Sequence, residues 1–380
     1  MELSNHHIHR YAFILLLAAS LSACDRLRVE LQQTIDRGPS DTPIFTTTPY
    51  PEPVPTCSPR PTLAYLALDA MIPITTQNID QLAVLDRFEI MDADSFAWAQ
   101  NNRGLFYRID NTIHGFNLQS REEATAILRV PEGAKIQFCS AQSLMMASFD
   151  ETQRKDGYEV QIWDLETGQL EHTFTREDRT IKVTSHPRFS QDCSMVVVAS
   201  SGSPVYPSLF EVFDLASGSK IYQTTDPYPI ARDAAVHGPS QQLATGTGAG
   251  IFLWGLGGIE PWGEISPEVS DGRIDGFDPQ GRTLALPAVG PPQVELWDLQ
   301  EMQPFARFEG SFAGFSPDGA WLVTSDVDGF TLWDIGSGEP LMEFPTAASV
   351  RISPDQSMLL VAYGPGSYED IVEVWGVPSE

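Results

Sequence analysis

Seven short segments that end in a bulky aromatic residue recur along the chain, and this repetition restricts the fold more than any other feature. Two typical examples are "VQIWDLETGQL" (160–170) and "GFTLWDIGSGEPL" (329–341). Each is a run of β-forming residues, then an aromatic residue, then a turn rich in Asp, Ser and Gly. We call the seven aromatic residues the anchor residues: Phe116, Trp163, Phe213, Trp254, Trp297, Trp333 and Trp375. Successive anchors are 47, 50, 41, 43, 36 and 42 residues apart.

A second matching element precedes the anchors. It is clearest in "FSPDGAWLVTS" (315–325) and "ISPDQSMLLVAY" (352–363), and looser in "FSQDCSMVVVAS" (189–200). Each predicts the end of one strand, a tight turn, and a hydrophobic strand. A unit therefore contains strand a, a turn, strand b, a variable loop, strand c ending at the anchor, a turn, and strand d. Four short strands in a repeat of about 40–45 residues predict an all-β propeller.

Together the two elements resemble WD40 repeats in their divergent bacterial form, over about residues 82–380. The resemblance implies a single seven-bladed β-propeller. It also implies that the N-terminal strand "LAVLDRFEI" (82–90) closes the last blade, whose own sequence ends after strand c. Under the same resemblance Trp333 packs between neighbouring blades, and Asp334 helps the following turn reverse the chain into strand d.

The N-terminal residues predict an export signal. "YAFILLLAASLSAC" (11–24) is an apolar run that ends in small residues and is too short for a good membrane span. Leu21-Ser22-Ala23-Cys24 resembles the bacterial lipobox. The resemblance implies cleavage between Ala23 and Cys24 and lipidation of the Cys24 sulfur. The alternative is an ordinary cleavage site that happens to precede a cysteine. We expect an extracytoplasmic protein, lipid-anchored to a bacterial membrane by its acyl chains.

The segment after Cys24 predicts a tether. Residues 38–62 contain eight prolines and six threonines, and proline fixes φ and removes an amide donor, so this stretch cannot enter a sheet interior. The expected organisation is a signal peptide over 1–23, a lipid anchor and Pro/Thr-rich linker over 24–62, and the propeller over 63–380.

Composition argues against several kinds of partner and site. The formal net charge of −28 repels nucleic acid and anionic lipid headgroups, and otherwise indicates a soluble surface. No zinc spacing, phosphate loop or nucleophile motif is found, so we predict no cofactor, no metal and no catalytic residue. Asp326 and Asp328 in "SDVDG" (325–329) resemble a fragment of a calcium loop, but a hairpin turn is expected there. We expect a monomer.

Three cysteines remain after Cys24: Cys57, Cys139 and Cys193. Cys139 and Cys193 fall in adjacent repeats but at different positions of the repeat. The sequence slightly favours two buried thiols over a disulfide and leaves both possibilities open.

The long, varied b–c and d–a loops predict the recognition face, because variable loops on a rigid scaffold commonly bind ligands. The alternative is drift of unconstrained loops. The tyrosines expected in these loops are Tyr158, Tyr206, Tyr228, Tyr363 and Tyr368.

The function that the sequence favours is a non-catalytic scaffold that binds a protein or another envelope component. The alternative is an extracytoplasmic propeller enzyme, a hydrolase or lyase acting on glycan or peptide. A fold alone does not choose between them. A desolvated cluster of carboxylates or histidines at the central channel would favour the enzyme, and an exposed aromatic patch on the loop face would favour the scaffold. A small-ligand site in the channel has no support in the sequence.

Overall fold

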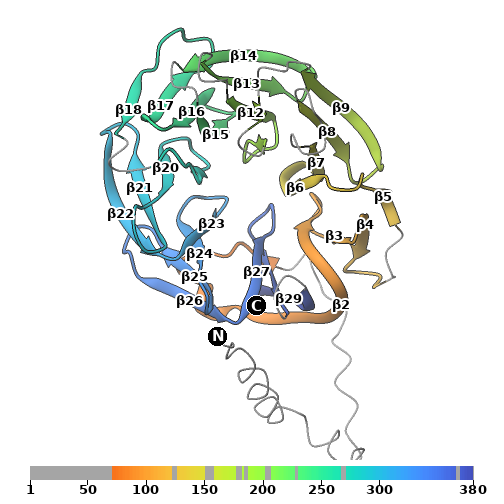
Figure 1. The fold of residues 1–380 in the computed structure, drawn as a ribbon. Coiled ribbons are helices and arrows are strands. Elements are labelled where there is room, and N and C mark those ends of the chain that lie inside the picture. The colour runs from red at the N-terminus through yellow and green to blue at the C-terminus, as the bar shows by residue number, and fades with distance from the viewer. Residues whose placement is uncertain are drawn as a thin grey trace, which may run out of the picture. The chain divides into compact units, whose positions relative to one another are not determined.

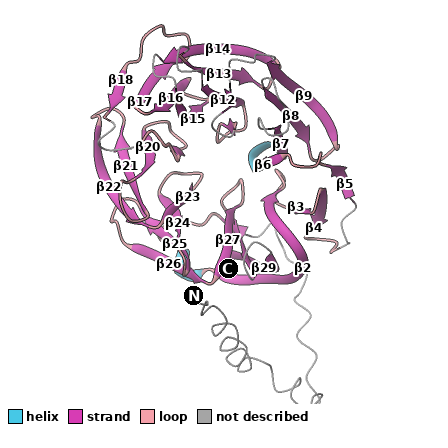
Figure 2. Ribbon diagram, viewed as in Figure 1, coloured by secondary structure: helices cyan, strands magenta, loops and turns pink. Residues whose placement is uncertain are grey.

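The computed structural model describes residues 71–121, 126–149, 158–176, 182–183, 187–201, 207–226, 230–266, 271–364 and 369–379. All of them belong to one compact unit, residues 62–380. The predicted signal peptide, Cys24 and the linker lie outside the described residues. Helix in the described part is limited to two short 3-10 turns, η2 (Ile79–Gln81) and η3 (Ser140–Gln142) (Figure 2). None of the helices found there is long and apolar enough to cross a membrane.

The described strands form a β-propeller: antiparallel sheets follow one another in chain order around a central opening (Figure 1). Each four-stranded sheet presents its first strand to the opening and its last strand to the outside. The four-stranded sheets contain, in order, β6 (Lys135–Cys139), β7 (Leu144–Phe149), β8 (Tyr158–Asp164) and β9 (Gln169–Arg176); β15 (Ala231–His237), β16 (Gln242–Thr247), β17 (Gly250–Gly255) and β18 (Gly263–Ile265); β19 (Gly276–Phe277), β20 (Thr283–Pro287), β21 (Gln293–Asp298) and β22 (Gln303–Glu309); and β23 (Ser311–Phe315), β24 (Trp321–Ser325), β25 (Gly329–Asp334) and β26 (Pro340–Pro345).

Two further sheets complete the described strands. The five-stranded sheet contains β10 (Lys182–Val183), β11 (Arg188–Phe189), β12 (Met195–Ser201), β13 (Ser208–Asp214) and β14 (Ser219–Asp226). The eight-stranded sheet contains β1 (Met71–Ile72), β2 (Ala83–Trp98), β3 (Gly104–Ile109), β4 (Thr112–Asn117), β5 (Ala126–Arg129), β27 (Ala347–Ile352), β28 (Met358–Tyr363) and β29 (Glu369–Pro378).

The expectation of seven blades is wrong, because the described strands pair into six sheets. The cause is β2, a strand of 16 residues. Its first half pairs with β29, which is the pairing expected for residues 82–90, and its second half pairs with β3. The register shifts between Glu89 and Ala93, and Asp92 between them has φ 63°. The first and last repeats therefore share one continuous sheet that joins the N-terminal and C-terminal strands.

The anchor residues all lie in the third strand of a four-strand meander, each opposite a residue of the second strand. Four of them lie against a phenylalanine on the outer strand of a neighbouring meander, at ring-centroid distances of 4.8 Å (Phe116 and Phe88), 4.3 Å (Phe213 and Phe174), 5.7 Å (Trp333 and Phe308) and 5.4 Å (Trp375 and Phe344). These contacts fill the space between successive meanders with aromatic surface.

The polar residue after an anchor organises the turn into the outer strand. Asp334 Oδ1 accepts hydrogen bonds from the amides of Gly336 (2.7 Å) and Ser337 (3.2 Å). Gly338 then adopts φ 74°, a left-handed conformation that glycine enters without strain. The side chain of Asp164 makes the equivalent pair of bonds at its own turn. The turn role expected for Asp334 is thus present in the structure.

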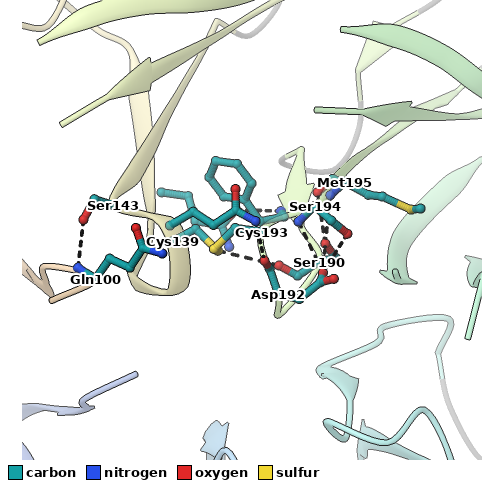
Figure 3. The surroundings of a disulfide bond; sticks show 11 residues. Gln100, Cys139, Ser143, Ser190, Asp192, Cys193, Ser194 and Met195 are labelled. Atoms are coloured by element: carbon teal, nitrogen blue, oxygen red, sulfur yellow. Dashed lines mark hydrogen bonds between the residues drawn. A yellow bond between two sulfur atoms is a disulfide. The ribbon is translucent and has the colours of Figure 1, made fainter. Parts of the chain in front are cut away.

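A disulfide joins neighbouring sheets between Cys139, at the end of β6, and Cys193, in the turn before β12 (Figure 3). The Cα atoms are 5.9 Å apart, and the bond links residues 54 apart in sequence. The slight preference of the sequence for two free thiols is therefore wrong. The two residues occupy different positions in their repeats, but adjacent sheets meet at unequal positions, and there the two side chains approach each other.

Candidate functional site

The central opening contains the candidate site. A cavity of about 500 Å³ is lined mainly by residues of β6, β11, β15, β19, β23 and β27, which are the strands nearest the opening (Figure 1). A second cavity, of about 450 Å³, shares Gln137 and Arg188 with the first. A third, of about 270 Å³, shares His237 and Phe315 with the first and is bordered by prolines of the a–b turns. The large cavity therefore lies between the other two along the channel.

Three charged residues from three successive sheets meet where the first two cavities adjoin. Arg188, on β11, is 3.2 Å from Asp233 Oδ2, on β15. Its Nη1 also donates to the backbone oxygens of Ile274 (2.5 Å) and Asp275 (3.1 Å), just before β19. Asp233 accepts further bonds from the amides of Ala234 (2.9 Å) and Ile274 (3.2 Å). Arg188 thus ties three sheets together through one carboxylate and two carbonyls.

Asp275 differs from Asp233 in how its carboxyl is used. Its Oδ2 is buried and accepts no hydrogen bond from the described residues. Desolvation raises the pKa of Asp275 to about 7; Arg188 and Arg273 lower it, and the charge of Asp233 raises it further. Burial also raises the pKa of Asp233, against the opposing effect of Arg188. In this cluster the Asp233 carboxylate is paired with Arg188, whereas the charge of the Asp275 carboxyl group changes near neutral pH.

The Asp275→Asn variant should be more stable than the wild type at pH 8 and equally stable near pH 4. The folded state holds the Asp275 proton up to about pH 7, whereas the unfolded chain releases it near the usual 3.8. The folded state then binds more protons, so the contribution of Asp275 to stability is lost as pH rises from about 4 to 7. Urea unfolding at both pH values should show a gain of roughly 4 kcal/mol for the variant at pH 8 only. An equal difference between the two chains at both pH values would contradict this assignment.

The second cavity is cationic although the whole chain carries −28. Its lining includes one carboxylate, Asp233, and four cationic side chains, Lys135, Arg188, Arg232 and Arg273. The exposed carboxylate of Asp271 lies 3.9 Å from Arg232 and 3.5 Å from Arg273 and offsets part of this charge. The remaining positive charge favours anions at this end of the channel.

His237 lines the large cavity, but both of its ring nitrogens contact other residues of the protein. It is 3% exposed, and its Nδ1 and Nε2 lie 2.6 Å from Ser240 Oγ and 3.1 Å from the Pro279 carbonyl oxygen. Both ring nitrogens are occupied, so the imidazole is poorly placed to exchange a proton with a ligand. Because Asp233 is also fully engaged, Asp275 has no available carboxylate or imidazole partner among these residues for paired acid–base chemistry.

The tyrosines expected on the recognition face do not form one exposed group. Tyr158 begins β8 instead of lying in a loop, is 2% exposed, and donates from Oη to Glu211 Oε2 at 2.8 Å. That expectation is corrected for Tyr158, because its hydroxyl serves an internal contact. Tyr363 ends β28 and is half-buried; burial and the neighbouring Glu373 raise its pKa to about 12. Tyr206, Tyr228 and Tyr368 lie outside the described residues.

Asp326 and Asp328 form a turn in the β24–β25 hairpin. Asp326 Oδ1 accepts hydrogen bonds from the amides of Asp328 (2.7 Å) and Gly329 (3.0 Å). Across the described ranges, no group of three or more His, Cys, Asp or Glu side chains is arranged to hold a metal ion.

The residues at the channel come from segments far apart in sequence, and no local motif marks them. Arg188 and Asp275 are separated by 87 residues. A charged residue next to the first, innermost strand of a repeat is the signal that would have pointed to them. Comparison with known protein families and with curated proteins finds no match to this sequence. The propeller assignment therefore rests on the strand pairing and on the arrangement around the central opening.

Proposed function

We propose that the chain is a lipid-anchored, extracytoplasmic propeller that acts as a recognition or assembly scaffold for a protein of the cell envelope. Support for its location comes from the apolar run and lipobox-like sequence at 11–24. The internal disulfide agrees with an oxidising compartment. The observation that carries the binding function is the closed ring itself, in which one continuous sheet joins the first and last repeats. A rigid ring presents loops at one end without needing them for its own stability.

The anchoring proposal predicts that Cys24→Ser gives a chain that carries no lipid and keeps residues 1–23. Without the sulfur no lipid can be attached, and cleavage at a lipobox follows lipid attachment. The matched control is Cys57→Ser, which should stay with the membranes. The readout is fractionation of the source cells, with mass spectrometry of the N-terminal peptide. A Cys24→Ser chain that is cleaved after residue 23 like the wild type, or an unlipidated wild-type Cys24, would refute the anchor.

The scaffold proposal is tested by photo-crosslinking in intact cells from two ends of one sheet. Val327, at the tip of the β24–β25 hairpin, is 100% exposed and lies at the loop end. Ser337 is exposed in the turn between β25 and β26, at the opposite end of the same strands. A photoreactive residue at 327 should give a discrete protein adduct, and one at 337 should not. Equal adducts from both positions, or none from either, would count against a protein partner at the loop end.

A second candidate function is a hydrolase or lyase acting on glycan or peptide, and it is favoured by Asp275. A carboxyl that titrates near pH 7 beside a cavity is a usual general acid or base. A binding protein should show no turnover of envelope glycans or peptides. Turnover that the wild type catalyses and the Asp275→Asn variant loses would replace the scaffold with the enzyme.

A further inference from the structure

The central channel combines three chemical surfaces that are unrelated to partner binding at the loops. The end lined by Arg232 and Arg273 is cationic. The middle is lined by the carboxyl group of Asp275 and the side-chain amides of glutamines, and phenylalanine rings line the same wall. The large cavity, of about 500 Å³, is within the size range of small-ligand sites. Such sites place a few polar groups in a mostly apolar wall, and each surface here restricts what the occupant can be.

The cationic end requires an anionic group. Arg232 and Arg273 line the second cavity, and their side chains are 44% and 70% exposed, so they face solvent at its entrance. Each lies near Asp271, whose side chain is 48% exposed. Among the described residues at this end, the cationic side chains of Lys135, Arg188, Arg232 and Arg273 outnumber the carboxylates of Asp233 and Asp271. Planar guanidinium groups suit carboxylates in particular.

The middle of the channel requires hydrogen-bond donors and acceptors on the same ligand. Asp275 lines the large cavity with a half-buried side chain; because its Oδ2 is buried, its carboxyl group meets a ligand through Oδ1. Gln137 and Gln191 line the same cavity and are exposed to it. A carboxyl and two amides at one site match several hydroxyl groups, each of which both donates and accepts. An inorganic anion would leave Asp275 without a partner.

The wall of the large cavity also offers apolar faces. Phe189 and Phe312 are only partly buried where they line it, and Phe312 is held against Phe315 with ring centroids 5.0 Å apart. These rings are fixed flat surfaces that suit a ligand with a C–H face. A polyhydroxylated ring with a carboxylate has all three required properties.

We propose that the channel binds a short acidic saccharide, with a carboxylate toward Arg232 and Arg273, hydroxyl groups toward Asp275 and Gln137, and the apolar face of a sugar ring on Phe189 and Phe312. This site is independent of the proposed scaffold function, because it lies in the channel and not at the loop tips. The wall supplies a charge partner, hydrogen-bond partners and apolar contact for separate parts of one ligand.

The test is calorimetric titration of the full-length chain with digalacturonate, its neutral counterpart digalactose, and sulfate. Digalacturonate should bind, and the other two should bind at least tenfold more weakly, since digalactose lacks the carboxylates and sulfate lacks the hydroxyl groups and the sugar ring. Combined Arg232→Gln and Arg273→Gln substitution should weaken digalacturonate binding about tenfold or more, a loss typical of charge-assisted contacts. Raising the salt concentration should also weaken it.

Matched variants separate the site from general charge effects. Arg282→Gln also removes an exposed arginine, but this residue lines none of the three cavities, and binding should not change. Asp275→Asn should weaken digalacturonate by losing a hydroxyl acceptor, without creating sulfate binding. No digalacturonate binding, equal binding of sulfate, equal binding of digalactose, or full binding by the double arginine variant would each overturn the proposal. None of these results bears on the crosslinking at Val327.

Discussion

Replacing Glu211 with alanine should lower the free energy of unfolding by about 3 kcal/mol, because this carboxylate is the shared acceptor of a buried contact between two sheets. Glu211 lies on β13 and is 2% exposed. It accepts hydrogen bonds from Tyr158 Oη (2.8 Å), Arg176 Nη1 (3.1 Å) and Lys220 Nζ (2.8 Å). Tyr158 and Arg176 belong to β8 and β9 of the preceding sheet, whereas Lys220 belongs to β14 of the same sheet.

The size of this effect follows from what alanine leaves behind. The Tyr158 hydroxyl stays buried and loses its acceptor, and an unpaired hydroxyl in an apolar environment destabilises the folded state. The side chains of Arg176 and Lys220 are 28% and 41% exposed, so water partly replaces their lost partner and keeps the total near the lower end for a broken buried pair. Burial, followed by the charge of Glu211, raises the pKa of Tyr158, so its hydroxyl stays protonated and able to donate.

Urea unfolding of the full-length chain measures this prediction, with two comparison variants. Glu343→Ala removes an exposed glutamate from β26 and should change stability by less than about 0.5 kcal/mol. Tyr158→Phe keeps the ring and removes only the hydroxyl, so it should cost about 1 kcal/mol. If Glu211→Ala were as mild as Glu343→Ala, the cluster would contribute nothing to holding the two sheets together.

The sequence predicts the repeating unit well because turn chemistry is local. An aromatic residue, an Asp that caps the next amides, and a Gly that enters positive φ all lie within a few residues, as around Trp333, Asp334 and Gly338. The fourth residue of each a–b turn shows the limit of that approach. In the seven turns this residue is Asn102, Ser143, Cys193, Gln241, Gly281, Gly319 or Gln356, and its φ lies between 52° and 69° in each. Only two of the seven are glycine. The surrounding hydrogen bonds impose the conformation, so its residue type varies.

The number of sheets could not be predicted because it depends on whether β2 ends near residue 90 or continues to residue 98. Residues 83–98 contain neither Gly nor Pro, so nothing in this stretch forces a break after residue 90. The chain shifts register at Asp92 and continues as the innermost strand of the next meander. A local bulge of this kind leaves almost no sequence signature, yet it merges two repeats into one sheet.

The channel and the disulfide were missed because both depend on contacts between sheets. Cys139 and Cys193 occupy different positions within their repeats, so an alignment of the repeats does not pair them, although they are bonded in the structure. In the same way Arg188, Asp233 and Asp275 come from three different sheets. Their convergence follows from closing the ring, a long-range property that spacing within one repeat does not contain.

Replacing both Cys139 and Cys193 with alanine should lower the free energy of unfolding by about 4 kcal/mol under oxidising conditions, since the bond closes a loop across 54 residues. Both side chains are buried, at 8% and 0% exposed, so alanine also removes some packing in the core between two sheets. Urea unfolding with and without a reducing agent separates these contributions. Reductant should lower the stability of the wild type and leave the double variant unchanged. If the reductant leaves the free energy of unfolding of the wild type unchanged, the disulfide is absent or inaccessible. Mass spectrometry of the alkylated chain distinguishes these two cases.

The same bond connects stability with the compartment proposed for the protein. If the N-terminal signal exports the chain, Cys139 and Cys193 should resist alkylation when intact source cells are denatured without reductant. A chain in which a single Met replaces residues 1–23 should stay in the reducing cytoplasm, with both thiols alkylated and a stability close to that of the double alanine variant. Export would then add about 4 kcal/mol to the stability of the propeller through this bond. Equal alkylation of the two chains would separate the disulfide from export and remove its support for an extracytoplasmic location.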